Sequence, residues 1–172
     1  MKSYVIDVNV PIVANGKTPH ADLDCEEACI NMLLEIQEKG CVLLDDKRLI
    51  FSEYVRHLSP RGQPGVGDAF MHWLNENQGI LTRCKFIAIN FVGNSRTDFA
   101  EYPDDPALAA FHRKDRKYIA VAAAAADKKP TILNAVDSDY CDYQKELKSN
   151  GITVKQLCPQ CCKGKSAKTR NN

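Results

Sequence analysis

The sequence predicts an α/β fold in which helices are layered around a central, mainly parallel sheet. Short apolar segments of strand length alternate along the chain with longer segments that carry apolar residues at helical spacing. This alternation is typical of strand–helix–strand units, which build parallel sheets. The 172 residues fit one compact domain, and no internal repeat is evident.

The expected strands are short and mostly apolar. The first begins at Ser3 and runs to Val8 with an acid near its end, and the second is closed by the pair Asp45 and Asp46. The full set covers residues 3–8, 41–44, 85–91, 131–136 and 152–157.

The expected helices begin at capping residues and end at helix breakers. In the longest one, Asp24 can cap the first turn, apolar side chains recur at helical spacing, and Gly40 ends the helix. The full set covers residues 24–39, 49–58, 68–77, 115–126 and 143–150. The polar or glycine-rich stretches 15–24, 62–67 and 94–105 are expected to be loops.

The composition places few limits on function. The chain has 23 basic and 22 acidic side chains, so a nucleic-acid partner would depend on local clustering of charge. The longest apolar stretch, residues 118–126, is too short to span a membrane. Asp7 interrupts the N-terminus before a signal-peptide core can form. A cytoplasmic protein without a membrane partner is therefore expected.

The eight cysteines are expected to be free thiols, several of them buried, because nothing in the sequence indicates export. Cys158 and Cys161 form a Cys-x-x-Cys pair, but a zinc site normally requires a second pair or histidines. Cys141 is the only nearby candidate in the sequence. Residues 1–157 are expected to form the domain, and residues 158–172 a basic, flexible, Cys-containing tail.

Four carboxylates are candidates for one site. Asp7 lies near the end of the first expected strand, and Asp137 follows the fourth directly. Because ligands collect at the carboxyl ends of parallel strands, both acids can face the same crevice. Asp115, which opens an expected helix, and Glu53, which lies within another, can approach that crevice as well.

Clustered carboxylates repel one another unless protons or a cation neutralise them, and oxygen-rich sites suit Mg²⁺ or Mn²⁺. Such ions activate water and stabilise charge on a phosphoryl oxygen. Each acid also has a structural interpretation. Asp115 can be a helix cap, Glu53 a solvated helix residue and Asp137 part of a turn. Only Asp7, which ends an apolar strand, indicates a site by itself.

Four segments in order resemble the PIN family of nucleases, over residues 4–157. The run Tyr-Val-Ile-Asp-Val-Asn at 4–9 resembles that family's first strand, and Leu-Ile-Phe-Ser-Glu-Tyr at 49–54 its second acidic segment. The run Asp-Arg-Lys-Tyr-Ile-Ala from 115 resembles the helix that opens with the third acid. Ile-Leu-Asn-Ala-Val-Asp-Ser-Asp-Tyr at 132–140 resembles the strand and turn that bear the fourth.

The resemblance implies a three-layer α/β/α sandwich and phosphodiester hydrolysis, most often of RNA. It implies that Asp7, Glu53, Asp115 and Asp137 are catalytic metal ligands, with Asp139 close by and Asn9 in support. Asp46 is the alternative candidate for the family's second acid if Glu53 is not that residue. Two departures stand out: residues 134–135 replace a usual Thr or Ser, and residues 62–105 are longer than in small toxin-type members. The second departure argues against a toxin–antitoxin role more than against nuclease chemistry.

Basic side chains adjoin two of these acids and could hold backbone phosphates, or be solvated or paired with nearby acids. They are Arg56, Arg113, Lys114, Arg116 and Lys117. His112 could protonate a leaving oxygen, or be a surface histidine.

The sequence thus predicts a Mg²⁺- or Mn²⁺-dependent endoribonuclease acting in toxicity, phage defence or RNA processing. A structure-specific or single-strand DNA nuclease and an inactive PIN-like binding or scaffold subunit are the alternatives. A second copy of the chain or a protein regulator is a further candidate partner.

Overall fold

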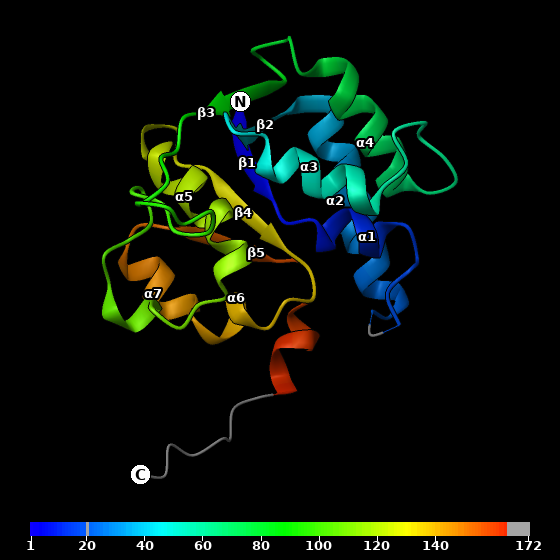
Figure 1. Ribbon diagram of the computed structural model, residues 1–172. Coiled ribbons are helices and arrows are strands. Elements are labelled where there is room, and N and C mark those ends of the chain that lie inside the picture. Colours follow the sequence, from blue (N-terminus) through cyan, green and yellow to red (C-terminus); the bar gives the residue numbers. More distant parts are fainter. Residues whose placement is uncertain (20, 165–172) are drawn as a thin grey trace.

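The computed structural model, which describes residues 1–19 and 21–164, has a five-stranded sheet in which every pairing is parallel (Figure 1). The strands are β1 (Lys2–Ile6), β2 (Gly40–Asp45), β3 (Cys84–Ile87), β4 (Thr131–Asn134) and β5 (Thr153–Gln156). Their order across the sheet is β3-β2-β1-β4-β5, so the first strand of the chain lies at the centre. The predicted α/β fold with a parallel sheet is confirmed.

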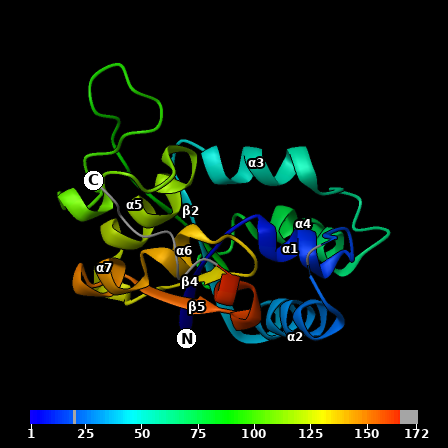
Figure 2. The same cartoon turned by 90° about the horizontal axis from the view of Figure 1, so that it is seen from below.

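Helices cover both faces of the sheet and form a three-layer fold. Figures 1 and 2 show α1, α2 and α4 on one side, and α5, α6 and α7 on the other. The α-helices are α1 (Asn9–Ala14), α2 (Leu23–Lys39), α3 (Leu49–His57), α4 (Val66–Asn77), α5 (Arg116–Ala124), α6 (Asp139–Asp142) and α7 (Gln144–Ser149). Short 3-10 turns are η1 (Pro106–Leu108), η2 (Arg113–Asp115), η3 (Ala126–Lys128) and η4 (Pro159–Gly164). In the described part of the chain, no helix is long and apolar enough to cross a membrane.

The burial of each strand follows its place in the sheet. All six residues of β2 are buried, because helices cover both of its faces and β1 and β3 flank it. The edge strand β5 instead alternates exposed and partly buried residues. Continuous apolar runs are the sequence signature of buried parallel strands, which explains why β1, β2 and β4 could be recognised from the sequence.

Several local features differ from the sequence prediction. The chain turns into α1 only three residues after β1, where no helix was expected. Asp22, not Asp24, caps α2 by accepting a hydrogen bond from the Cys25 backbone nitrogen. The expected tail is structured in its first part, because Cys158 is buried and η4 follows it. The remainder of that tail, residues 165–172, lies outside the described residues.

Asp45 shows how a strand end can fix the next helix. Its two carboxylate oxygens accept hydrogen bonds from the backbone nitrogens of Leu49 and Ile50, at 2.7 and 2.8 Å. These are donors in the first turn of α3, which the helix itself cannot satisfy. The buried Asp45 therefore orients α3, the helix that carries Glu53.

A close backbone approach joins α4 to α1. A Cβ atom placed on Gly67 would lie 1.9 Å from the carbonyl oxygen of Pro11, so only glycine fits there. Near the other end of the same segment, Gly79 has no atom within 4 Å of such a Cβ. Gly79 lies two residues beyond the end of α4 and has room for a Cβ atom, so it provides a Gly→Ala control without a packing clash.

We expect Gly67→Ala to lower the free energy of unfolding by about 2 kcal/mol, because α4 must move away from α1 to admit the methyl group. Gly79→Ala is the matched control and should change stability by less than about 0.5 kcal/mol. Urea denaturation followed by circular dichroism measures both. Equal stabilities for the two variants would contradict the close approach.

Candidate functional site

Asp7 is the central residue of the candidate site. It follows β1 at the carboxyl edge of the sheet, and its residue is only 3% exposed. Oδ1 accepts a hydrogen bond from the Asn9 backbone nitrogen at 2.9 Å, whereas Oδ2 is buried and has no hydrogen-bond partner. A buried carboxylate oxygen without a partner is costly, so this atom needs a proton or a cation.

Two more acids act on Asp7 through their charges. Asp115, at the end of η2, and Asp137, just beyond β4, both raise its pKa, although burial has the larger effect. The pKa of Asp137 is raised in turn by burial and then by repulsion from Asp115 and Asp139. These four carboxylates therefore belong to one electrostatic cluster.

Backbone and histidine contacts tie the outer side of this cluster together. The Asp139 backbone nitrogen donates to Asp137 Oδ1 at 2.9 Å, and the His112 backbone nitrogen donates to Asp139 Oδ2 at 2.9 Å. The ring of His112 contacts Asp115 through Nδ1 and Oδ2, which are 2.6 Å apart. The turn before α5 is thus joined to the turn before α6, and the imidazole lies at the solvent-exposed edge.

Glu53 lies beside the cluster and is already paired. Its Oε2 accepts a hydrogen bond from the Tyr118 hydroxyl at 2.6 Å and lies 2.8 Å from the Lys117 ammonium nitrogen. The Tyr118 oxygen also accepts from the Val8 backbone nitrogen at 3.2 Å. Lys117 is buried and lowers the pKa of Asp7 by its positive charge. The lysine therefore neutralises part of the negative charge.

An amide network holds the strand ends in place. Asn134, the last residue of β4, is fully buried and accepts from Asn9 Nδ2 at 2.8 Å. Its own Nδ2 donates to the Asp137 carbonyl oxygen and to Gln156 Oε1. Asn9 Oδ1 accepts from the Ala135 backbone nitrogen. Asn134, which stands where Thr or Ser was expected, therefore links the start of α1 to β4 and β5.

Three buried tyrosines surround the acids, and sequence reasoning did not identify them as part of the site. The Tyr54 hydroxyl donates to the Ile6 carbonyl oxygen, and Tyr118 contacts Glu53 as described. The Tyr140 hydroxyl lies close to Asp7 without a hydrogen bond of ordinary geometry. Burial, followed by the neighbouring carboxylates, holds the pKa of all three phenols well above the usual value. Only their contacts across the fold reveal them.

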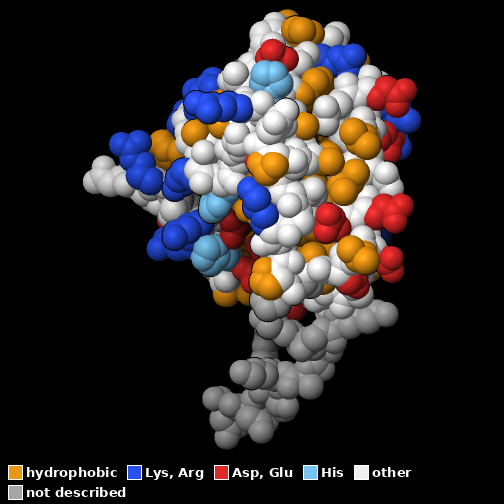
Figure 3. All heavy atoms as spheres, turned by 90° about the vertical axis from the view of Figure 1, so that its right-hand side faces the viewer, with side chains coloured by type: hydrophobic (Ala, Val, Ile, Leu, Met, Phe, Trp, Pro, Cys, Tyr) orange, Lys and Arg blue, Asp and Glu red, His pale blue; other side chains and the backbone are white. Residues whose placement is uncertain are grey.

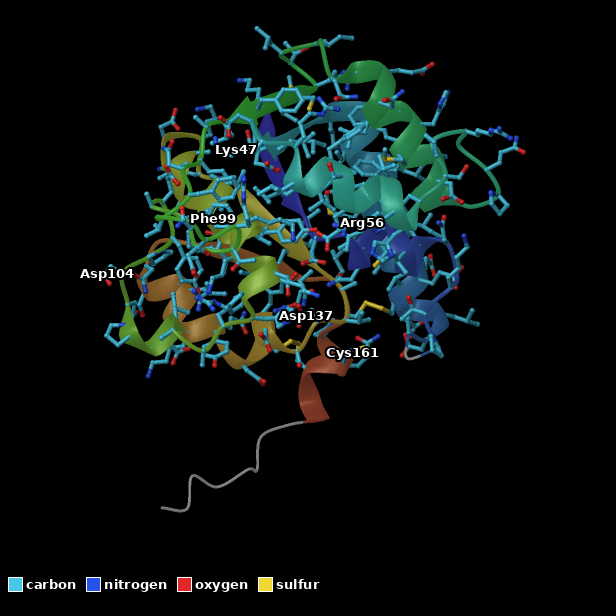
Figure 4. All side chains as sticks on the ribbon, in the orientation of Figure 1. Lys47, Arg56, Phe99, Asp104, Asp137 and Cys161 are labelled. Atoms are coloured by element: carbon cyan, nitrogen blue, oxygen red, sulfur yellow. A yellow bond between two sulfur atoms is a disulfide. The ribbon has the colours of Figure 1, made fainter. Side chains whose placement is uncertain are left out.

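A basic groove of about 400 Å³ adjoins Glu53. Its basic lining consists of Arg56, His57, Arg96, Lys114 and Lys117. Figure 3 shows basic side chains grouped along one edge of the molecule, with acidic side chains recessed between two histidines. In Figure 4, Arg56 lies on α3 above Asp137, whereas Asp104 lies at the outer edge of the molecule.

The other predicted contributors lie elsewhere. Arg113 and Arg116 both pair with Asp98, at 2.7 and 2.6 Å, and fix the long loop before η1. Asp46 pairs with Lys47 and accepts from the Ile89 backbone nitrogen beside β3. Asp46 is therefore no substitute for Glu53, and the two arginines are not free to hold a phosphate.

The carboxylates fit a hard cation in chemistry but are loosely spaced. They offer oxygen ligands, and one of them is buried without a partner. Their oxygens do not form a group of three within 4.8 Å; among the described residues that spacing is met by Cys25, Cys29 and Cys158. A cation would therefore draw the acids closer together and compete with Lys117 for their charge.

The prediction that the cysteines are free thiols is wrong for four of them. The structure pairs Cys25 with Cys158, and Cys141 with Cys162, as disulfides. Cys25 and Cys158 are 133 residues apart in the sequence, so only the fold shows that they meet. Cys141 does have a partner in the C-terminal segment, but it is Cys162 and not the Cys-x-x-Cys pair itself.

Comparison with models of known protein families gives no match, and neither does comparison with curated proteins or with solved structures. The function is therefore inferred from the residues of the site.

Asp7 makes the stability of the metal-free protein depend on pH. Burial is the main reason that the pKa of the Asp7 carboxyl is raised to about 8. An aspartate carboxyl in an unfolded chain has a pKa of about 4. Between these values the unfolded chain releases a proton that the folded chain keeps, so rising pH favours unfolding. The stability that the protonated Asp7 confers is complete below about pH 4 and is lost as the pH approaches about 8.

We therefore expect Asp7→Asn to gain stability relative to the wild type as the pH rises, in the presence of a chelator. The gain should be on the order of 3 kcal/mol between about pH 4.5 and pH 8. Urea unfolding at a series of pH values measures it. Parallel pH profiles for the two proteins would show that Asp7 is ionised in the folded state.

Proposed function

We propose that the protein is a divalent-metal-dependent endoribonuclease of the PIN type. The observation that supports this most directly is the partnerless, buried Oδ2 of Asp7, which lies under the charge of Asp115 and Asp137. Oδ1 accepts from the Asn9 backbone nitrogen at the start of α1, whereas Oδ2 has no such structural role. It gains one if a cation joins the three acids.

Asp7, Asp115 and Asp137 would hold Mg²⁺ or Mn²⁺, with Asp139 completing the set. A bound ion would supply an activated water and stabilise negative charge on a phosphoryl oxygen. The amide network of Asn9 and Asn134 would keep the β1 and β4 ends at a fixed separation.

The remaining side chains have separate tasks in this proposal. Lys117 and Tyr118 hold Glu53 at the border between the acids and the basic groove. Arg56 and Lys114 line that groove and would bind the phosphates that flank the scissile bond. His112, half exposed and hydrogen-bonded to Asp115, is placed to give a proton to the leaving oxygen.

A binding subunit without catalysis is the second candidate. The pairing of Glu53 with Lys117 favours it, because an acid that is neutralised by a lysine has less need of a metal. A DNA nuclease would use the same acids, so only the substrate distinguishes it from a ribonuclease.

The test is cleavage of single-stranded and structured RNA in the presence of Mn²⁺, with matched DNA substrates in parallel. The wild type should cut RNA, and Asp7→Asn should reduce the rate by at least about 100-fold, because it removes the central ligand. Asp104→Asn is the control, since this exposed acid lies at the outer edge of the molecule.

Faster cutting of DNA than of RNA would assign the DNA nuclease instead. If the wild type cuts neither, and Mn²⁺ does not raise its melting temperature, the binding-subunit function replaces the nuclease.

The basic groove predicts a separate effect on binding. We expect Arg56→Glu to weaken the binding of single-stranded RNA about 10-fold, because it replaces a phosphate contact with a repelling charge. Fluorescence anisotropy in the presence of a chelator measures the affinity without cleavage. Arg61→Glu makes the same charge change just after α3, outside the groove lining, and should alter the affinity less than about 2-fold. Equal losses in both variants would mean that net charge, not the groove, determines binding.

A further inference from the structure

The start of α2 and the C-terminal turn bring together cysteines from opposite ends of the chain. Cys25 and Cys29 lie one helical turn apart on α2, and Cys158 precedes η4. The sulfur atoms of these three residues all lie within 4.8 Å of one another, and all three residues are fully buried. Figure 2 shows η4 beside α2.

A fourth cysteine comes from the same turn. Cys161 lies on η4, where its backbone nitrogen donates to the Cys158 carbonyl oxygen at 3.0 Å (Figure 4). It is half-buried and packs against the core, and its charge raises the pKa of the Cys29 thiol, after burial as the main cause. Cys161 is not one of the three residues whose sulfurs lie within 4.8 Å of one another, so its side chain would have to turn toward them to complete a set of four. The four cysteines form one Cys-x-x-x-Cys pair on a helix and one Cys-x-x-Cys pair on a tight turn.

Hydrogen bonds to Asp22 also hold these two cysteine pairs against each other. Asp22 Oδ1 caps α2 by accepting from the Cys25 backbone nitrogen at 2.8 Å. The same oxygen accepts from Gln160 Nε2 at 2.9 Å, and Gln160 lies between the two cysteines of the turn. This contact holds the start of α2 against the C-terminal turn in addition to the Cys25–Cys158 disulfide.

The disulfide between Cys25 and Cys158 accounts for only two members of the cluster. Cys29 remains as a third buried sulfur within reach of both. A disulfide needs no such neighbour, whereas a tetrahedral metal site needs four sulfurs that converge from two elements.

We propose that the reduced chain binds one Zn²⁺ through Cys25, Cys29, Cys158 and Cys161. Zinc–sulfur bonds of about 2.3 Å in a tetrahedron place the sulfurs about 3.8 Å apart, which is compatible with the observed cluster. The site would be structural, because four protein ligands leave no open position for a substrate. It goes beyond the proposed nuclease function and does not depend on it.

Zinc binding requires that the Cys25–Cys158 disulfide is first reduced. A phosphine reductant supplies two electrons to the Cys25–Cys158 disulfide and becomes a phosphine oxide, while water provides its oxygen and the two protons of the new thiols. The four thiols then bind Zn²⁺ as thiolates and release their protons to solvent.

The experiment is metal analysis of the full-length protein, purified with a phosphine reductant and zinc and then freed of unbound metal. We expect about one zinc per chain in the wild type, and less than about a tenth of that in Cys29→Ser and Cys161→Ser. Cys162→Ser is the matched control, because Cys162 adjoins Cys161 but pairs with Cys141 in the structure. It should retain its zinc, as should Cys84→Ser, which alters a buried cysteine in β3.

Cobalt substitution of the wild type gives an independent measurement if a variant fails to fold. A tetrahedral four-sulfur site produces intense visible and sulfur-to-cobalt charge-transfer bands, and zinc should abolish them. The proposal would be overturned if the reduced, folded wild type contained no bound zinc and showed no cobalt bands after cobalt substitution. Bound iron in place of zinc, or loss of zinc from Cys162→Ser with retention in Cys161→Ser, would also overturn it.

Discussion

The candidate site depends on one electrostatic constraint: Asp7 is a carboxylate at the end of the central strand, buried with one oxygen unsatisfied. A position at the centre of a parallel sheet removes it from water, and the neighbouring strand ends bring further acids toward it. Burial and the neighbouring acids raise the pKa of Asp7, whereas two interactions lower it. Asn9 donates a backbone hydrogen bond to Asp7, and Lys117 supplies a positive charge nearby.

Helix α5 contributes to the site from the opposite side of the sheet edge. Its first turn carries Lys117 and Tyr118, which contact Glu53 on α3, and Asp115 precedes it directly. The start of this helix therefore provides one acid, Asp115, together with the lysine and the phenol that hold a second acid, Glu53. Asp98 fixes the start of this helix through Arg116, so the long loop before it contributes to the site without providing a ligand.

The sequence was sufficient for the fold because the information needed was local. Apolar runs identify buried strands, and breakers separate them from helices, so the strands and the helices α2, α3, α4, α5 and α7 could be placed to within a few residues. The short helices α1 and α6 were not predicted. Asp7 and Asp137 could be predicted as neighbours because the carboxyl ends of parallel strands share an edge. Their actual proximity to Asp115 rests on how α5 packs, which the resemblance implied and local patterns did not.

What the sequence could not reveal depends on contacts between distant residues. Asn134 looks like an ordinary strand residue in the sequence, yet its side chain joins the end of β4 to the start of α1 and to β5. The basic residues around Asp115 look alike in sequence, yet Arg113 and Arg116 pair with Asp98 while Lys117 turns inward. Cys25 and Cys158 are separated by most of the chain, so the sequence does not indicate that they meet, and Cys141 was the only partner considered for the Cys-x-x-Cys pair.

The contact between Gly67 and Pro11 links the stability of one face to the geometry of the site. Pro11 belongs to α1, which begins two residues after Asp7, so any displacement of α4 acts on the segment that carries the key acid. In directed evolution, the effects of substitutions at Gly67 and at Pro11 would therefore depend on each other, although neither residue belongs to the acid cluster. Substitutions at the α1–α4 contact would change the stability of the fold and the geometry around Asp7 together.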